Sequence, residues 1–359
     1  MPFTAAELAD INNATMDFWL DRRKKSQNQN LTTKPMLAEF EKRAKERVPG
    51  GQGDIVVKVK AGQGGLTLQG YSGDDQVGYG NPTGLRNARY PWKEHHIGIV
   101  ITHTELKKDG IEVIEANGGE RTREVSGREE TALADLYEEK LDMMGEDYDY
   151  SLDRLLHMDG TADPKSLAGI MALLTVAPAS GSTGGLSRVL NPWWRNRAAT
   201  AANAAAGGQG AITSTPANGG ALIQFLQAEK RRRTRYAGGG ASVVYFAGSD
   251  WIGAYETELR ANGNYSMTGW RGEQDGAMGA LKFDGDPVVW DPTLDDMGLT
   301  KRAIAIDFKQ ISLEYLKGQR QKKHHPSRPY DRYVMYNGLT MTGALIARQL
   351  NTSGIYDIV

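Results

Sequence analysis

One long amphipathic segment constrains this chain more than any other feature. Residues 127–160 carry apolar residues mostly 3 to 5 positions apart, the repeat of a single helix face. The apolar positions are Ala132, Leu136, Leu141, Met144, Tyr148, Leu152, Leu155 and Leu156, and the acidic positions are Glu129, Glu130, Asp135, Glu138, Glu139, Asp142, Glu146 and Asp147. Ser126 and Glu129 have capping-box spacing. The predicted helix is roughly 45 Å long, which suits the backbone of a flat molecule.

Composition excludes several classes of protein. The chain has no cysteine, which removes disulfides, thiolate catalysis and metal sites built on thiolates. Its formal net charge is −1, whereas a dedicated duplex-DNA-binding protein usually has a positive excess. No stretch approaches the roughly 20 apolar residues of a membrane-spanning helix, and residues 1–25 do not resemble a secretory signal. A length of 359 residues allows two domains or one large domain.

Glycine is unusually frequent and clustered. It accounts for 43 of the 359 residues, about 12% against a usual 7%. The clusters lie at 50–53, 62–65, 78–84, 182–185, 207–210, 219–220 and 238–240. Well-patterned helices and strands lie between them, which predicts a folded protein with long loops.

The first 49 residues are expected to form an arm. Residues 4–25 have loose helical spacing, and residues 36–48 predict a short charged helix that ends before Pro49. These segments cannot bury their own apolar residues. They therefore need another surface, in their own chain or in a neighbour.

The following region is expected to extend from the body of the protein. Residues 54–61 and 65–71 alternate apolar and polar positions and predict two strands. Residues 72–94 have many turn residues and no core period, and residues 96–106 predict a further strand. A two-stranded excursion is marginal alone in water, so it also needs a partner.

Residues 161–359 have a mixed helix and strand pattern. Helices are expected at 219–240 and 250–263, the second with Asp250 as its N-cap. The other expected elements are an apolar segment at 166–174, strands at 241–248 and 303–307, a hairpin at 280–291, a short helix or strand at 311–318, a break at 321–329, and two strands within 330–350 joined at Asn337-Gly338.

The sequence has no local signature of a catalytic or metal site. It lacks a P-loop, a dinucleotide-binding glycine pattern and a G-x-S-x-G elbow. Histidine doublets occur at 95–96 and 324–325, but adjacent residues of a strand point to opposite faces. Acidic pairs are abundant, and nothing singles out two of them as a glycosidase pair. The sequence therefore predicts no enzyme, no bound metal and no cofactor.

Residues 184–197, GGLSRVLNPWWRNR, place two tryptophans beside two arginines. The pair could stack on bases or on a sugar, but aromatic residues and arginine are also enriched at protein–protein contacts. A wholly intrachain corner is the alternative. The basic strips at 22–25 and 230–233 admit a solvated helix end, a phosphate contact or a salt-bridged subunit contact, and the neutral chain favours the last.

The order of these parts resembles that of the major capsid proteins of tailed bacteriophages, with the Hong Kong 97-type fold. The segment GGLSRVLNPWWRNR is similar to a Gly-Gly-Ile-Asp/Ser-Arg…Pro-x-Trp-Arg segment of that family. Residues 87–113 resemble the return of its extended hairpin, residues 151–174 the end of its spine helix, and residues 328–358 its closing strands. The likeness covers nearly the whole chain, although the motifs are loose.

The resemblance implies an α+β fold with a defined division of the chain. The parts are an N-terminal arm at 1–49, an extended β-hairpin loop at 50–97, a peripheral domain at 98–164 with the spine helix at 127–158, an axial domain at 165–325, and C-terminal strands at 326–359 that return to the peripheral domain.

The resemblance also implies a function. Many copies would self-assemble as hexamers and pentamers of an icosahedral head around double-stranded DNA, which contacts the inner face without sequence specificity. The location would be a virion capsid, assembled in the host bacterial cytoplasm. The arm is too short for a fused scaffold, so separate scaffold and portal proteins are expected, and decoration proteins are left open. No membrane partner and no cofactor are implied.

Aromatic and basic residues of the exposed segments are the expected intersubunit contacts. They are Trp19, Arg22, Arg23, Tyr79, Arg86, Arg89, Tyr90, Trp92, Trp193, Trp194, Arg195, Arg197, Arg231 and Arg232. The alternatives are an encapsulin-like cargo shell of the same fold, a soluble carbohydrate-active enzyme, and a DNA-binding protein that uses the basic strips. Particle contents, size in solution and salt-dependent affinity distinguish them.

Overall fold

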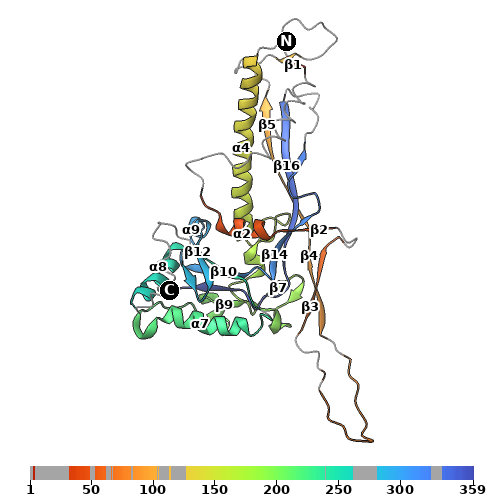
Figure 1. The fold of residues 1–359 in the computed structure, drawn as a ribbon, viewed down its shortest axis with the longest axis vertical. Coiled ribbons are helices and arrows are strands. Elements are labelled where there is room, and N and C mark those ends of the chain that lie inside the picture. Colours follow the sequence, from red (N-terminus) through yellow and green to blue (C-terminus); the bar gives the residue numbers. More distant parts are fainter. Residues whose placement is uncertain are drawn as a thin grey trace. The chain divides into compact units, whose positions relative to one another are not determined.

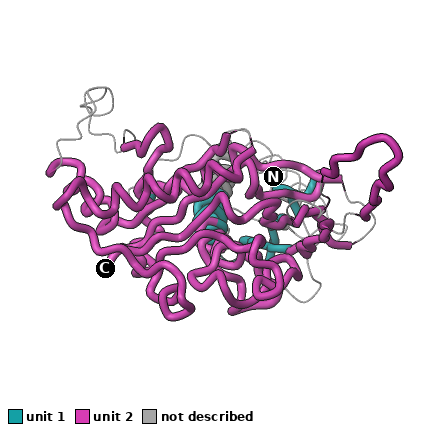
Figure 2. The backbone as a smooth tube through the Cα atoms, turned by 90° about the horizontal axis from the view of Figure 1, so that it is seen from below, with its two compact units in different colours: residues 1–32, 94–152, 318–342 teal, residues 33–93, 153–317, 343–359 magenta. Residues whose placement is uncertain are grey.

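The structure is a computed structural model whose described residues fall into two compact units (Figure 2). The described residues are 3–4, 32–48, 53–61, 66, 68–81, 84–102, 104, 113–114, 127–238, 240–261, 281–324 and 334–359, with side chains described in the long helix from Lys140 onward. The first unit comprises residues 1–32, 94–152 and 318–342, and the second comprises residues 33–93, 153–317 and 343–359.

The long helix predicted from the sequence is present as α4 (Gly127–His157). The part of α4 that lies in the first unit packs on a small sheet in which β5 (Lys93–Thr102) and β15 (Lys322–His324) both pair with β16 (Val334–Ala347). A separate two-stranded sheet pairs β1 (Phe3–Thr4) with β6 (Val113–Ile114).

The apolar face of α4 covers one face of this sheet. Leu141 and Met144 are buried against Leu339 of β16, with Ile97 and Ile99 of β5 beside them. Because strand side chains alternate, the residues between these positions face the other way. Over the described side chains of α4, the apolar face predicted from helical spacing is therefore the face that packs.

The second unit is built on a six-stranded sheet (Figure 1). Its strands, in spatial order, are β11 (Lys282–Phe283), β12 (Asp286–Trp290), β10 (Val243–Ala247), β13 (Arg302–Asp307), β17 (Gly354–Asp357) and β9 (Arg197–Ala199). Strand β17 lies in the second unit together with residues 343–359, whereas residues 334–342 lie in the first unit.

Two helices cover one face of the six-stranded sheet. These are α7 (Ala221–Thr234) and α8 (Ser249–Ala261), and Trp251 of α8 is buried in the core they form with β10 and β13. Every residue of β10 is buried, which explains its continuous apolar run. Burying each of its valine and phenylalanine side chains contributes about 1.5–3 kcal/mol.

The second unit also holds a parallel strand pair and an open hairpin. Here β14 (Ile311–Leu316) pairs with β2 (Lys45–Arg47) and with the end of β16, and β3 (Ile55–Lys60) pairs with β4 (Leu85–Tyr90). The remaining elements are α2 (Pro35–Arg43), α5 (Ile170–Leu173), β7 (Ser182–Thr183), β8 (Leu186–Ser187), η1 (Pro192–Trp194), α6 (Ala201–Ala205), η2 (Ala217–Gly219) and α9 (Pro292–Asp296).

Several boundaries differ from the sequence predictions. The predicted helix 36–48 ends at Arg43, and the chain then enters β2, because Glu46 lies opposite Tyr315 in a parallel ladder. Asp250 is not an N-cap: it lies within the first turn of α8 and accepts a hydrogen bond from Thr300 Oγ1 at 2.7 Å.

The hairpin and the final strands also differ. The predicted strand 65–71 is absent over the described residues 66 and 68–71, and β3 pairs instead with β4, which lies in a stretch predicted to have no core pattern. Asn337 and Gly338 form no turn, because they lie inside the continuous strand β16. Thr4, the first residue of the predicted helix 4–25, lies in β1. The rest of that segment and the capping residue Ser126 lie outside the described residues.

The break predicted at 321–329 is wrong at Lys322–His324, which form β15 because they pair with β16. The other predicted elements of the described residues are confirmed. Helices α7 and α8 and strands β10 and β13 occupy the expected segments, and β14 is the strand form of the segment at 311–318. The turn of the β11–β12 hairpin has positive φ at Asp284 (46°) and Gly285 (90°), as a tight hairpin turn requires. The expected mixed helix and strand fold is thus present.

Candidate functional site

The described side chains include no group of three or more His, Cys, Asp or Glu residues that could hold a metal ion. Nor does any described helix have the length and apolarity needed to cross a membrane. On the sheet of the first unit, an open hollow of about 580 Å³ is lined by His96, His324 and Thr340, among others. One residue of each histidine doublet therefore reaches the same hollow, and His324 Nε2 lies 2.9 Å from Thr340 Oγ1.

The tryptophan pair is divided between the interior and the surface of the second unit. Both residues lie in the short helix η1, with ring centroids 5.8 Å apart. Trp194 is only 1% exposed, and its Nε1 donates to the Thr183 carbonyl at 3.0 Å. Trp193 is half-buried. The prediction of an intersubunit contact is therefore wrong for Trp194, which is a core residue, whereas Trp193 keeps an exposed part.

A buried arginine organises the loop beneath this corner. The Arg188 guanidinium donates to Thr175 Oγ1 at 2.7 Å, to the Ser180 carbonyl at 3.1 Å and, through Nε, to Thr183 Oγ1 at 2.8 Å. These hydrogen-bond partners are hydroxyl and carbonyl oxygens, and burial lowers the pKa of Arg188. One side chain thereby holds several turns of the segment that carries the tryptophans.

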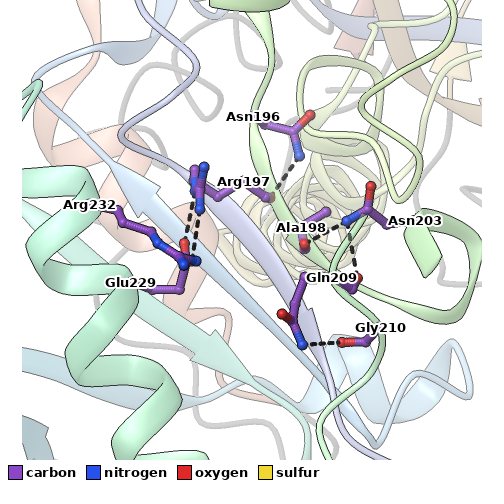
Figure 3. A network of polar contacts seen from close by, with 8 residues as sticks. All are labelled: Asn196, Arg197, Ala198, Asn203, Gln209, Gly210, Glu229 and Arg232. Atoms are coloured by element: carbon purple, nitrogen blue, oxygen red, sulfur yellow. Dashed lines mark hydrogen bonds and ion pairs between the residues drawn. The ribbon is translucent and has the colours of Figure 1, made fainter. Parts of the chain in front are cut away.

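A charge network joins the edge strand β9 to α7 (Figure 3). Arg197 donates to both carboxylate oxygens of Glu229 at 2.8 Å, and Arg232 donates to Glu229 Oε1 at 2.7 Å. Burial acts to raise the pKa of Glu229, but the two arginines lower it more, so the net pKa is depressed. The two predicted contact arginines are therefore engaged within their own chain, and Arg197 is half-buried there.

The edge of β9 is covered by the helix α6 that follows it. Asn203 Nδ2 donates to the Ala198 carbonyl at 2.9 Å and to the Gln209 carbonyl at 3.0 Å (Figure 3). A covered edge does not offer this part of the strand for pairing with another chain. The arrangement therefore favours side-chain contacts over strand addition at this edge.

The basic end of α7 is partly buried and partly exposed. Arg233 is buried, with its guanidinium hydrogen-bonded to the Tyr245 hydroxyl and lying over the Tyr245 ring. Arg231 and Arg232 are exposed, and Arg235 stacks beside the exposed ring of Tyr236. The predicted contact residues Arg231 and Arg232 thus lie on the surface of the second unit.

The loop between β3 and β4 exposes large apolar side chains. Tyr79 is 96% exposed, and Leu66, Leu68 and Tyr71 are exposed on the same loop. Figure 1 shows β3 and β4 side by side, continuing into this loop. Exposed apolar side chains gathered on one segment are typical of a surface that another molecule covers.

The base of the β3–β4 hairpin is fixed to the rest of the second unit. Tyr90 is buried and donates its hydroxyl to the Ala347 carbonyl at 3.0 Å, so its predicted role as an intersubunit contact is wrong. The Arg89 backbone N–H donates to the Gly184 carbonyl at 2.9 Å. Gly184 has a φ of 58°, and a Cβ there would lie 3.0 Å from the Ala88 Cβ.

The remaining predicted residues have mixed outcomes. Arg86 and Arg89 are exposed on β4, and Trp92 is half-buried just beyond it. Arg195 is half-buried and donates from Nε to the Arg188 carbonyl at 2.8 Å. The arm residues Trp19, Arg22 and Arg23 lie outside the described residues.

Sequence reasoning overlooked the buried polar residues. His157 contacts Asp291, which is distant in sequence, while Glu258 of α8 accepts the backbone N–H groups of Leu222 and Ile223 at the start of α7. The only local signal for the first contact was the spacing of Asp153 and His157, one helical turn apart on an otherwise apolar face.

Comparisons with known proteins give a consistent picture. No protein-family model matches the sequence, and no similar curated protein was found. The capsid of cyanophage A-1(L) matches with a TM-score of 0.60 at 15% identity, over 93% of this chain and 95% of the other. The capsid of an empty GTA particle matches with a TM-score of 0.56 at 11% identity, with the same two coverages.

A third solved structure extends this likeness. The capsid of the Myoviridae phage XM1 matches with a TM-score of 0.51 at 14% identity, again over 93% of this chain and 95% of the other. At such identities the likeness lies in the backbone arrangement, and it spans nearly the full length of each chain. The chain therefore has the fold of bacteriophage major capsid proteins.

Proposed function

We propose that this chain is the major capsid protein of a tailed double-stranded DNA bacteriophage and that its role is structural and not catalytic. The observation that carries the proposal is the fold likeness to three capsid subunits over 93% of the chain. Copies of the chain would form hexamers and pentamers that close into an icosahedral head. Closed symmetric assembly needs the same surfaces to be buried on every copy.

The parts of a Hong Kong 97-type subunit can be assigned within this proposal. Helix α4 would be the spine helix, the β3–β4 hairpin the extended loop, and the six-stranded sheet with α7 and α8 the axial domain. Residues 1–49 would be the N-terminal arm. The assignment is supported by the order of these elements along the chain and by the exposed apolar loop that follows β3.

The contact residues of the proposal are those that the second unit leaves accessible. They are Tyr79, Arg86, Arg89, Trp92, Trp193, Arg231 and Arg232, together with Trp19, Arg22 and Arg23 of the arm. Many modest contacts of this kind hold a shell together through multivalency. Separate scaffold and portal proteins would guide assembly in the bacterial cytoplasm, and packaged DNA would contact the inner face without sequence specificity.

Electron microscopy of the purified full-length chain, alone and co-expressed with its neighbouring structural genes, tests the proposal. We expect closed shells or flat capsomer arrays of uniform thickness. A chain that stays monomeric at high concentration under both conditions contradicts it. Shells that hold a protein cargo and never nucleic acid would indicate an encapsulin-like compartment instead.

A further inference from the structure

A buried charged cluster lies in the second unit at the end of α4. His157 is 0% exposed and lies between Asp153, one turn earlier on α4, and Asp291, which precedes α9. His157 Nε2 is 2.9 Å from Asp291 Oδ2, and its Nδ1 is 2.8 Å from the Asp153 carbonyl. None of these three residues belongs to the proposed contact residues described above.

The geometry places an oxygen atom within hydrogen-bond distance of each ring nitrogen of His157. A backbone carbonyl accepts hydrogen bonds and never donates, so Nδ1 must carry a proton to bond to Asp153. An ionised carboxylate likewise only accepts, so Nε2 must carry a proton to bond to Asp291. When Asp291 is ionised, both nitrogens donate and His157 is an imidazolium that lies between two acidic side chains.

The same carboxylates act on the starts of two other helices. Asp291 is the N-cap of α9 and accepts from the Thr293 N–H at 3.1 Å, while Thr293 Oγ1 donates to Asp153 Oδ2 at 2.5 Å. The Leu37 N–H, in the first turn of α2, lies close enough to Asp153 to lower the pKa of that carboxyl. Among the described groups, the charges acting on His157 are those of Asp291 and Asp153.

The chain passes from one unit to the other next to Asp153, and also just before α2. These crossings lie at 152/153, within α4, and at 32/33. We propose that His157, Asp153 and Asp291 form a proton-controlled lock that holds the starts of α2 and α9 to the end of α4. The lock lies wholly within the second unit and is independent of the proposed function.

The direction of the pH effect follows from the charges. Burial acts to lower the pKa of His157, but Asp291 and Asp153 raise it more, so the net pKa is raised. A raised histidine pKa contributes stability below the unfolded value and loses it as pH rises through the folded value. Burial also raises the pKa of Asp153, and the stability lost through that shift is lost at acid pH, as pH rises through the folded pKa of the carboxyl. The lock therefore weakens as pH rises above neutral.

Loss of the His157 proton has a direct structural cost. One ring nitrogen would then present a lone pair to an oxygen that also has only lone pairs, in a site without water access. Asp153 and Asp291 would remain as two buried carboxylates with no cation between them. The first turns of α2 and α9 should therefore exchange their amide hydrogens earlier than the sheet does.

Nitrogen NMR of the full-length chain with labelled histidine tests the proposal without a mutation. At about pH 7.5, above the ordinary histidine pKa of about 6.5, we expect one histidine that still has protons on both ring nitrogens. The His324→Gln variant should keep this signal and His157→Gln should lose it. A His157 signal with one bare nitrogen at about pH 6 overturns the proposal.

The stability of variants provides a second test. The thermal midpoint of the wild-type chain should fall between about pH 6 and pH 9, and His157→Gln and Asp153→Asn should both flatten that fall. His324→Gln, at an exposed histidine of the first unit, should leave it unchanged. If His157→Gln does not fold, the Asp153→Asn variant and the NMR signal of the wild-type chain test the proposal. An unchanged fall in Asp153→Asn overturns the proposal.

Discussion

At the scale of single residues, burial decides which aromatic and basic side chains remain available for contact. Trp194 and Tyr90 look like interface residues by type, yet each is buried and bonded to a backbone carbonyl of its own chain. Trp193, beside Trp194, keeps an exposed part. Residue type thus indicates a large side chain with a polar atom, and the fold determines whether that atom faces inward.

The tryptophan pair gives a direct test. Trp194→Ala should destabilise the chain by about 3–5 kcal/mol, because it leaves a cavity and removes the hydrogen bond from Nε1 to the Thr183 carbonyl. Trp193→Ala should cost about 1 kcal/mol or less, mainly through its contact with the Trp194 ring. Urea unfolding of the unassembled chain measures both. Equal losses of stability in the two variants would contradict the assignment of Trp194 to the core and of Trp193 to the surface.

The buried Glu229 pair predicts a pH dependence opposite to that of the histidine cluster. Because the pKa of Glu229 is depressed, its contribution is present above the ordinary glutamate value and is lost as pH falls through the lower folded value. Glu229→Gln should cost about 3 kcal/mol at neutral pH, since Arg197 loses its carboxylate partner. It should also reduce the fall in stability at acid pH.

The matched control is Glu256→Gln. Glu256 pairs with Arg260 at 3.0 Å on the exposed side of α8, where an ion pair contributes about 0.5 kcal/mol or less. Acid titration of the unfolding free energy compares the two variants. If Glu229→Gln leaves the fall of the unfolding free energy at acid pH unchanged, that fall arises elsewhere in the chain.

At the scale of elements, partners distant in sequence complete the ends of helices and strands. The start of α7 has no side-chain cap of its own, and Glu258 of α8 accepts its Leu222 and Ile223 N–H groups at 3.1 Å. The base of the β3–β4 hairpin is likewise fixed by Gly184, about a hundred positions later in the chain. Neither support is visible in a local window of sequence.

Two adjacent glycines test the fixation of the hairpin. Gly184→Ala should cost about 2–3 kcal/mol, because its Cβ would crowd Ala88 and Tyr90 at a positive φ. Gly185→Ala should cost about 1 kcal/mol, since it has a similar φ but open space around its Cβ. Hydrogen exchange in β4 should increase only in Gly184→Ala. Equal exchange in both variants would show that strain alone, and not crowding, determines the effect.

At the scale of the whole molecule, the hairpin loop carries apolar surface that its own chain does not cover. Leu68 and Tyr79 are almost fully exposed, and the strands leading to them carry the exposed cations Arg86 and Arg89. With a net charge of −1, copies of the chain repel one another little. Association between copies is therefore the expected way to cover the loop.

The double variant Leu68→Ser, Tyr79→Ser should keep the monomer's unfolding midpoint and reduce its association at least tenfold. Removing two exposed apolar side chains costs the fold almost nothing, whereas a tenfold loss corresponds to about 1.4 kcal/mol of contact energy. Light scattering over a concentration series measures the association. Lys58→Ser, on the adjacent strand, is the control. Unchanged association in the double variant would remove the loop from the contact.

The sequence by itself determined the elements whose pattern is local: the amphipathic α4, the apolar run of β10, the basic end of α7 and the Asp284-Gly285 turn. Its order of parts also indicated a capsid fold. Pairings and burial depended on the tertiary structure: β4 as the partner of β3, β2 beside β14, Asn337 inside a strand, and Trp194 in the core. Periodicity records which face of an element is apolar, but ladders and buried ion pairs join residues far apart in sequence. Only the folded chain brings such residues together.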